Sequence, residues 1–146
     1  MSNPNDNLAV SLFSEILTVD QLARSFVAKA LPKGMELSHF SVLNHLAHTG
    51  GEKTPAQLAK VFHLTRGAMT NTLGKLEWAG WVHIRPDWDD ARRKLVSIST
   101  SGMVARDVAV AAITPLIADV VDQVGAERVR ATLPVLRELR KKLMGE

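Results

Sequence analysis

The sequence predicts a mainly α-helical fold with one small β-hairpin (α+β), in the order helix, turn, helix, hairpin of a winged helix-turn-helix. Two segments carry this prediction. Residues 54–80 hold two short helical patterns separated by a tight turn. Residues 81–99 hold two runs rich in β-branched residues joined by a polar turn. Helical patterns at 8–31 and 100–144 flank this central part, 36–99.

Composition limits the chain to a few classes of protein. A chain of 146 residues with 46% hydrophobic composition suits one unit, 1–146, with a single core. The absence of cysteine excludes disulfides, thiolate metal sites and thiol-based sensing by this chain. The first seven residues form a polar tail without the features of a secretory signal, and no run of about 18 apolar residues occurs. We expect a cytoplasmic protein with no membrane partner.

The first two elements are predicted from periodicity and capping. Apolar residues recur every three or four positions from Leu8 to about Leu31, which predicts an amphipathic helix. Ser38 is a candidate N-cap for a second helix, which the Gly50-Gly51 pair should end.

The helix-turn-helix is predicted from two threonine caps. Thr54, followed by a proline, should cap a helix that runs to about Phe62. Thr65 should cap the next helix, residues 66–79, which Gly80 should end in a left-handed conformation. The second helix should bury Met69, Leu73 and Leu76.

The outward face of the helix at 66–79 carries side chains suited to DNA. Arginine can read guanine, asparagine can read adenine, and threonine or alanine can meet a thymine methyl group. Such residues stand at Arg66, Ala68, Thr70 and Asn71, and Lys75 is better placed for a phosphate. For a single residue, a plain solvated helix face is the favoured interpretation. The position of the set between a capped turn and a hairpin favours DNA reading instead.

The hairpin turn is predicted to carry Asp90, Arg92 and Arg93 at its tip. An arginine there is the kind of cation that a narrow minor groove attracts, and Asp90 could hold the Arg92 guanidinium extended. Residues 60–94 contain seven Lys and Arg against four acids, a surplus equal to the whole net charge of +3. Trp88 in the same turn either packs on the turn or lies exposed against sugar or a partner, and the sequence does not decide between these.

The C-terminal third should form long helices. Ser99 or Thr100 can cap a helix to Val124, which Pro115 should kink or break, and Gly125 separates a last helix at 126–143. The terminal helices hold more aliphatic residues than a small winged domain can bury. A two-fold symmetric homodimer held by the segments 8–31 and 100–144 is therefore expected.

Metal and catalytic sites are not indicated. His45 and His48 would share a helix face, with His39 about two turns earlier, but zinc sites usually need three or four converging ligands. Satisfied surface or interface histidines are the favoured interpretation, and a regulatory metal is the alternative. No nucleophile, base and orienting group occur together and there is no glycine-rich phosphate loop. We expect neither an enzyme nor a cofactor.

Four segments at characteristic spacing resemble the MarR family of bacterial transcriptional regulators over about residues 8–143. They are 37–43, 54–59, 73–82 and the pair formed by Asp90-Ala91-Arg92 with 96–102. The last pair looks like the family's Asp-x-Arg wing signature and its Leu-Thr-x-x-Gly start of the dimerisation helix. Ser99 stands here where the family usually has threonine, and a serine still allows capping.

The resemblance implies an obligate homodimer on a pseudo-palindromic operator, usually a repressor released by a small, often aromatic or phenolic, molecule. Carried over by position, it implies DNA contacts from Thr65, Arg66, Ala68, Thr70, Asn71 and Lys75, a phosphate contact from Thr54, and minor-groove insertion of Arg92 braced by Asp90. The effector pocket is not assigned. A metal-responsive member of the same fold and a winged-helix module for protein or RNA are the alternatives.

Overall fold

The computed structural model describes residues 2–146; Met1, the first residue of the expected polar tail, lies outside this range. Within it the elements are α1 (Asp6–Ala30), α2 (Leu37–Thr49), α3 (Pro55–Val61), α4 (Arg66–Trp78), β1 (Val82–Asp87), β2 (Asp90–Ile98), α5 (Thr100–Val124) and α6 (Ala126–Leu143). The mainly helical fold with one hairpin is confirmed. The first helix begins two residues earlier than expected, at Asp6, and so takes up part of the polar tail.

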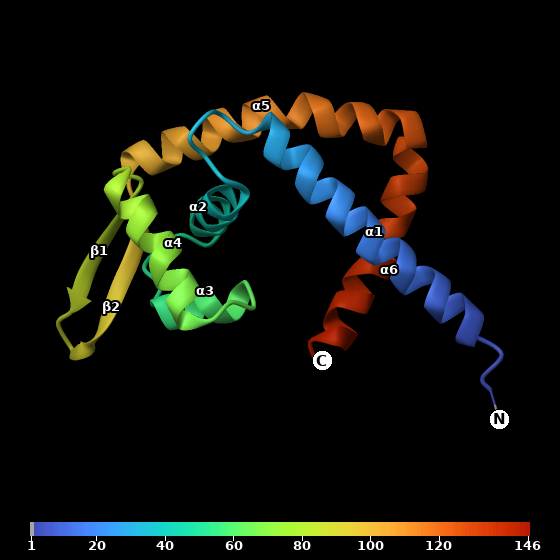
Figure 1. The fold of residues 1–146 in the computed structure, drawn as a ribbon, viewed down its shortest axis with the longest axis horizontal. Coiled ribbons are helices and arrows are strands. Elements are labelled where there is room, and N and C mark those ends of the chain that lie inside the picture. The colour runs from blue at the N-terminus through green and yellow to red at the C-terminus, as the bar shows by residue number, and fades with distance from the viewer. Residues whose placement is uncertain (1) are drawn as a thin grey trace.

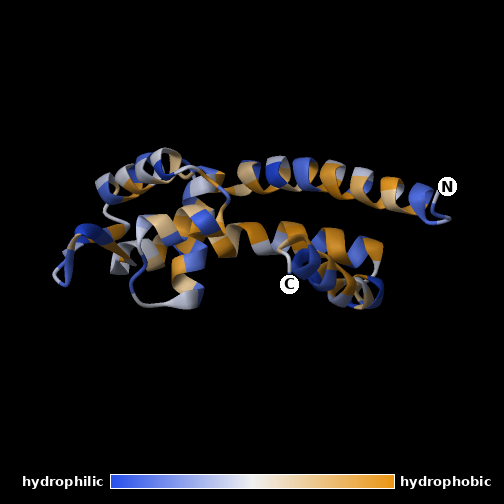
Figure 2. Ribbon diagram, turned by 90° about the horizontal axis from the view of Figure 1, so that it is seen from below, coloured by the Kyte–Doolittle hydropathy of each residue, from blue (hydrophilic) through white to orange (hydrophobic). Residues whose placement is uncertain are grey.

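The molecule has a compact lobe and a helical arm (Figure 1). The lobe contains α2, α3, α4 and the β1–β2 hairpin. Helix α5 leads away from the hairpin across the top of the lobe, and α6 turns back from its far end. Helix α1 overlaps α6 in that view, but the view from below separates them (Figure 2). The two ends of the chain therefore belong to the arm, and the predicted helix-turn-helix and hairpin to the lobe.

The core lies inside the lobe and is built from the inward faces of its helices. Leu43 and Leu46 of α2, Leu58 of α3, and Met69 and Leu76 of α4 are all almost completely buried. Burying one such side chain stabilises the fold by roughly 1.5–3 kcal/mol. The inward positions expected for α4 are confirmed. The outward face of that helix is therefore fixed by packing rather than by the polar residues themselves.

Most of the predicted caps are present, and one is wrong. The Thr54 hydroxyl accepts from the Gln57 N–H at 3.1 Å, and the left-handed Gly80 follows α4 with φ of 79°. The expected cap at Ser38 is wrong, because α2 begins at Leu37 and its N-cap is Glu36. The Glu36 N–H donates to His39 Nδ1 at 3.1 Å. The helix therefore starts two residues nearer the N-terminus than expected.

Four residues join the hairpin to the arm. The Ser99 N–H donates to the Trp81 carbonyl at 2.9 Å, and the Ser99 hydroxyl donates to the Gly80 carbonyl at 2.6 Å. The same hydroxyl accepts from the Gly102 N–H at 2.9 Å, which caps α5. Ser99 thus holds together Gly80 after α4, Trp81 just before β1, and the first turn of α5. Ser99, rather than Thr100, is the cap of α5.

The two internal prolines do not break their helices. Helix α5 is continuous past Pro115, and α6 is continuous past Pro134. Of the kink or break expected at Pro115, the break does not occur; one hydrogen bond is lost there, and those of the turns on both sides keep the helix continuous. None of the helices in residues 2–146 is both long and apolar enough to cross a membrane.

Helices α1 and α6 bury no residue at all. Many of their large apolar side chains, and several in the second half of α5, lie exposed. Leu8, Val10, Leu17, Leu22 and Leu143 are each between 64% and 69% exposed. Contiguous apolar surface of this kind is unusual on a monomer and typically marks an interaction surface.

Candidate nucleic-acid interface

Helix α4 presents a polar face away from the core. Thr65 begins the helix by accepting the Ala68 N–H on its hydroxyl at 3.1 Å. Because Met69, Leu73 and Leu76 point inward, the opposite face is left for the residues expected to read DNA. Thr65, Arg66, Ala68, Thr70, Asn71 and Lys75 are all exposed. The structure thus leaves all six residues accessible on the surface of the lobe.

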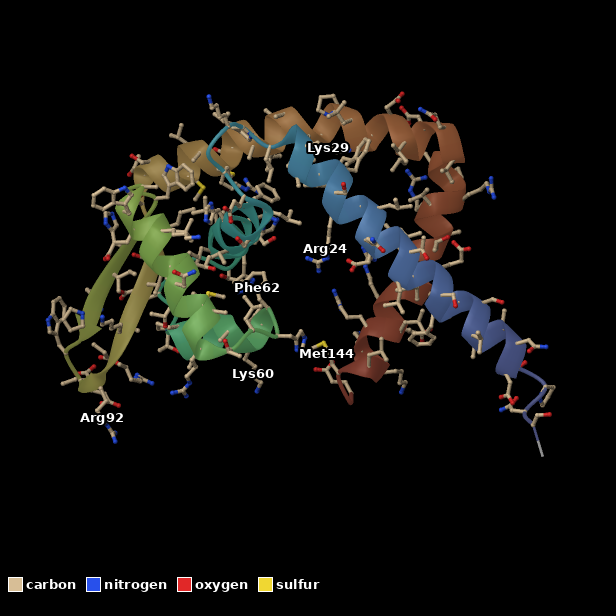
Figure 3. All side chains as sticks on the ribbon, viewed as in Figure 1. Arg24, Lys29, Lys60, Phe62, Arg92 and Met144 are labelled. Carbon is tan, nitrogen blue, oxygen red and sulfur yellow. The ribbon has the colours of Figure 1, made fainter. Side chains whose placement is uncertain are left out.

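Arg92 projects from the hairpin and is held by Asp90. The Arg92 Nε donates to Asp90 Oδ1 at 3.1 Å, and its backbone N–H donates to the same oxygen at 3.1 Å. The guanidinium remains 91% exposed, and Figure 3 shows it pointing away from the end of the hairpin. The hydrogen bond from Arg92 also holds the pKa of Asp90 below its usual value. The expected brace between these side chains is confirmed.

The residues expected at the hairpin tip lie on a strand instead. The turn itself is formed by Trp88 and Asp89, and Asp90, Arg92 and Arg93 belong to β2. Pro86 pairs with Lys94 but the next residue, Asp87, pairs with Asp90, so β2 carries extra residues in a bulge. A bulge leaves its residues outside the ladder and redirects their side chains. That is why Arg92 projects although it is not in the turn.

Arg93 is used inside the hairpin. Its Nη2 donates to Asp87 Oδ2 at 2.7 Å and its Nε donates to the same atom at 3.2 Å. The Asp87 side chain is only 7% exposed. The hydrogen bond from Arg93 is the main reason why the pKa of Asp87 lies below its usual value. Arg93 therefore stabilises the bulge as well as adding positive charge beside Arg92.

A side-chain cluster that the sequence did not predict, formed by Glu52, Arg85 and Trp88, lies at the hairpin. Arg85 donates from Nε and Nη2 to the two carboxylate oxygens of Glu52, each at 2.7 Å. The Arg85 guanidinium carbon lies 4.2 Å from the centre of the Trp88 ring. Trp88 is still 81% exposed. Of the two positions left open for Trp88, it takes the exposed one, steadied by a cation–π contact.

These ion pairs change the charge that the interface can offer. Arg85, Arg92 and Arg93 each have a carboxylate partner. Among residues 2–146 no ion pair involves Arg66 or Lys75 on α4. The cations of α4 are thus available to an external anion without first breaking an internal contact.

Thr54 and the histidines have internal partners. Thr54 is only 8% exposed and its hydroxyl caps α3. His45 meets the Phe62 ring edge-on with centroids 5.6 Å apart, and His48 Nδ1 lies 2.9 Å from the Asn44 carbonyl oxygen. In the part of the chain that the structure describes, no three potential metal ligands gather. The weak metal candidates His45 and His48 are therefore not brought together with a third ligand.

A cleft of about 1020 Å³ lies between the lobe and the arm. Its lining is largely apolar and includes three cationic side chains and one acidic one. It is lined by Ile16 of α1, by Lys60, Val61 and His63 at the end of α3, and by Leu136, Leu139, Arg140, Lys141, Leu143, Met144 and Glu146 at the C-terminus. Figure 3 shows Met144 beside the end of α3. The chemistry of this cleft suits a small apolar molecule that carries a negative charge.

Acid should loosen the hairpin. The folded-state pKa values of Asp87 and Asp90 are lowered by Arg93 and Arg92. Their contribution to stability is therefore complete at neutral pH and is lost as the pH falls from about 4 through the lowered values. We expect the amide protection factors of residues 87–94, which compare exchange with that of an unfolded chain at the same pH, to fall in that range. Asp87→Asn should remove much of this pH dependence, and equal protection factors at pH 7 and pH 3 would contradict the assignment.

Comparisons with known proteins fit this geometry. A family model described as MarR family matches residues 33–93. The multiple antibiotic resistance protein MarR of Escherichia coli (strain K12) is 41% identical over 49 residues, so the match spans 34% of this chain and 34% of that relative.

Solved structures resemble the chain over nearly its whole length. A cysteine-to-serine variant of Escherichia coli MarR complexed with operator DNA has a TM-score of 0.78 at 24% identity, covering 94% of this chain and 99% of that one. The transcriptional regulator BldR from Sulfolobus solfataricus has a TM-score of 0.81 at 23% identity, covering 97% and 99%. At these identities the likeness establishes the fold, a winged helix with terminal helices.

Proposed function

We propose that this chain is a MarR family winged helix-turn-helix protein, a sequence-specific regulator of transcription that binds double-stranded DNA; the support is the family match over residues 33–93 and the shared fold. One observation carries the proposal. The exposed polar face of α4 and the projecting, braced Arg92 belong to the same lobe and leave its core intact. A helix for the major groove and an adjacent cation for the minor groove are what duplex reading requires.

In this proposal α4 enters the major groove with its N-terminal end first. Arg66, Ala68, Thr70 and Asn71 meet base edges, Thr65 approaches the backbone at the helix start, and Lys75 binds a phosphate. Arg92 enters the flanking minor groove, with Asp90 holding it and Arg93 beside it. Thr54 is a weaker candidate for a phosphate contact, since it is nearly buried.

The protein is proposed to act as a homodimer on a pseudo-palindromic operator. Residues 36–99 form the DNA-binding part, and residues 8–31 with 100–144 form the dimerisation part of one unit. The support is the exposed apolar surface of α1, α5 and α6, which no element of the same chain covers within residues 2–146. A two-fold axis through these helices would present two copies of the lobe to one face of the duplex.

Repression relieved by a small molecule is the proposed mode of regulation. The cleft between lobe and arm supports an effector with an apolar, for example aromatic, body and a negative charge. Because it is lined by α1, α3 and α6 together, a molecule bound there would change how the lobe is held on the arm. The spacing of two lobes in a dimer depends on that attachment.

The assignment of base readers and phosphate binders can be tested by exchanging residues on α4. The test begins with selection of a bound duplex from a random pool. Replacing Arg66 or Asn71 by Ala should cost about 1–3 kcal/mol on the selected site and relax preference at one position, because a base contact is lost. Lys75→Ala should weaken binding to the selected and the random duplex equally. It should also lower the slope of log affinity against log salt concentration by about one.

Fluorescence anisotropy at several salt concentrations measures both effects. Identical losses on selected and random duplexes for all three variants would reject direct base reading by α4. Failure to select any duplex from the pool would reject the proposed function.

A further inference from the structure

A shallow hollow on the exposed face of α4 contains two residues, Gly74 and Trp78, that have no role in the contacts described so far. It has a volume of about 400 Å³ and is lined by Thr70, Asn71, Gly74, Lys75 and Trp78. Its lining residues supply a hydroxyl, an amide, an ammonium group and an indole, but no carboxylate. The hollow lies on the side of α4 opposite Met69, Leu73 and Leu76, and so opens away from the core.

Gly74 forms the floor of this hollow without an internal reason for being glycine. A Cβ at this position would meet nothing within 4 Å, and its φ is not positive. Glycine in the middle of a helix lowers stability relative to alanine, because it has more conformational freedom to lose. Gly67, in the first turn, is the other glycine of α4, and Gly74 is the one that lies in the middle of the helix and in the lining of the hollow. A close approach by another molecule accounts for a glycine there.

Trp78 forms the end wall of the hollow, one turn beyond Gly74. It is 93% exposed, and none of the aromatic or cation–π contacts within residues 2–146 involves it. A large apolar side chain in this setting gains stability when a flat or apolar surface covers it. Lys75, also without an ion-pair partner in the described chain, stands beside it. The hollow therefore combines a cation with an uncovered ring.

We propose that this hollow seats the sugar–phosphate backbone of one DNA strand at the wall of the major groove. The phosphate lies against the bare helix at Gly74 and is held by Lys75, and the Trp78 indole covers the neighbouring deoxyribose. The proposal rests on the proposed DNA-binding function and deepens it. It assigns Gly74 and Trp78 to sequence-independent strand docking, next to the base readers at the start of α4.

The length of α4 supports this placement. At 1.5 Å per residue, Gly74 lies about 12 Å beyond Arg66, and the major groove is about 12 Å wide. When Arg66 reads a base inside the groove, the helix therefore reaches the groove wall near Gly74. The positive charge of Lys75 and the lack of a carboxylate in the lining favour an anionic group such as a phosphodiester over an apolar protein surface.

Gly74→Ala separates folding from docking. The change should raise the thermal midpoint by a few degrees, since the new methyl group meets no neighbour and alanine favours the helix. The same methyl group would hold the DNA strand away. We therefore expect roughly five- to tenfold weaker binding to both a selected duplex and a random duplex. If the floor of the hollow touches DNA, Gly74→Ala should be more stable than the parent and yet bind DNA more weakly.

Trp78→Ala and Trp78→Phe form the matched pair for the ring. Trp78→Ala should weaken binding to both duplexes roughly tenfold. Trp78→Phe should keep most of the wild-type affinity, because a flat ring remains. Neither should change the salt slope, in contrast to Lys75→Ala, because an indole carries no charge. Sedimentation of each DNA-free variant checks that its oligomeric state is that of the wild type.

The outcomes are distinct. Wild-type affinity in Gly74→Ala and Trp78→Ala, with the parent protein binding duplex normally, overturns the docking site and leaves the DNA-binding function standing. A change in sedimentation of Trp78→Ala without DNA identifies the ring as a contact between copies of the chain and likewise overturns the site. Failure of the parent protein to bind either duplex removes the proposed function and this site together.

Discussion

Gly102→Ala should lower the free energy of unfolding by about 3 kcal/mol or more, the largest loss expected from a single methyl group in this chain. The added Cβ would lie 1.9 Å from the Trp81 carbonyl oxygen, 2.8 Å from its carbonyl carbon and 2.9 Å from Ile98 Cγ1. Two of these atoms are backbone, and the Trp81 carbonyl is held by the Ser99 N–H. The neighbours therefore cannot move aside without breaking the joint between hairpin and α5.

The matched control for this change is Gly74→Ala, which is also a glycine-to-alanine replacement within a helix. It meets open space and should stabilise the protein by up to about 1 kcal/mol. Urea unfolding followed by circular dichroism compares the two variants with the parent. A Gly102→Ala protein as stable as the parent would show that hairpin and α5 do not meet as closely as described here.

Arg92→Ala should weaken operator binding by about 1–3 kcal/mol per subunit contact while leaving stability nearly unchanged. The guanidinium is almost fully exposed and its partner is Asp90 on the same strand. Removing the Arg92 guanidinium should hardly change the free energy of unfolding, because exposed ion pairs contribute little to stability. The cost falls instead on the minor-groove contact that the braced arginine is proposed to make.

Two neighbouring variants serve as controls for Arg92. Asp90→Asn keeps the cation but removes the charged brace, and so should weaken DNA binding less than Arg92→Ala. Arg93→Ala should lower stability, because it leaves the carboxylate of Asp87 without its partner. Anisotropy with the selected duplex and thermal melts give the two readouts. Unchanged affinity in Arg92→Ala would reject the minor-groove role.

The parts of the lobe that depend on neighbours in sequence could be predicted from the sequence. The caps at Thr54 and Thr65 bond to residues three positions away. The inward positions of α4 follow from helical periodicity. The Asp90–Arg92 contact could also be predicted, because the two residues are only two positions apart.

The remaining features depend on contacts that a linear pattern does not contain. The bulge that moves Arg92 out of the turn is stabilised by Arg93 reaching Asp87 on the other strand. Glu52 binds Arg85 from 33 positions away, and Gly102 is required only because Trp81 passes over it. The exposed Trp78 could have been noticed as an apolar residue on the polar side of the helix at 66–79, since its position follows from periodicity alone.

We expect two copies of this chain to place their α4 helices and hairpins on one face of duplex DNA, about one helical turn apart. The decisive experiment compares binding of the purified protein to a selected palindrome and to the same palindrome with five base pairs inserted at its centre. The insertion rotates one half-site to the opposite face, so we expect two chains per parent duplex and a large loss of affinity on the lengthened one. Equal affinity for the two duplexes, or one chain bound per duplex, would contradict this arrangement.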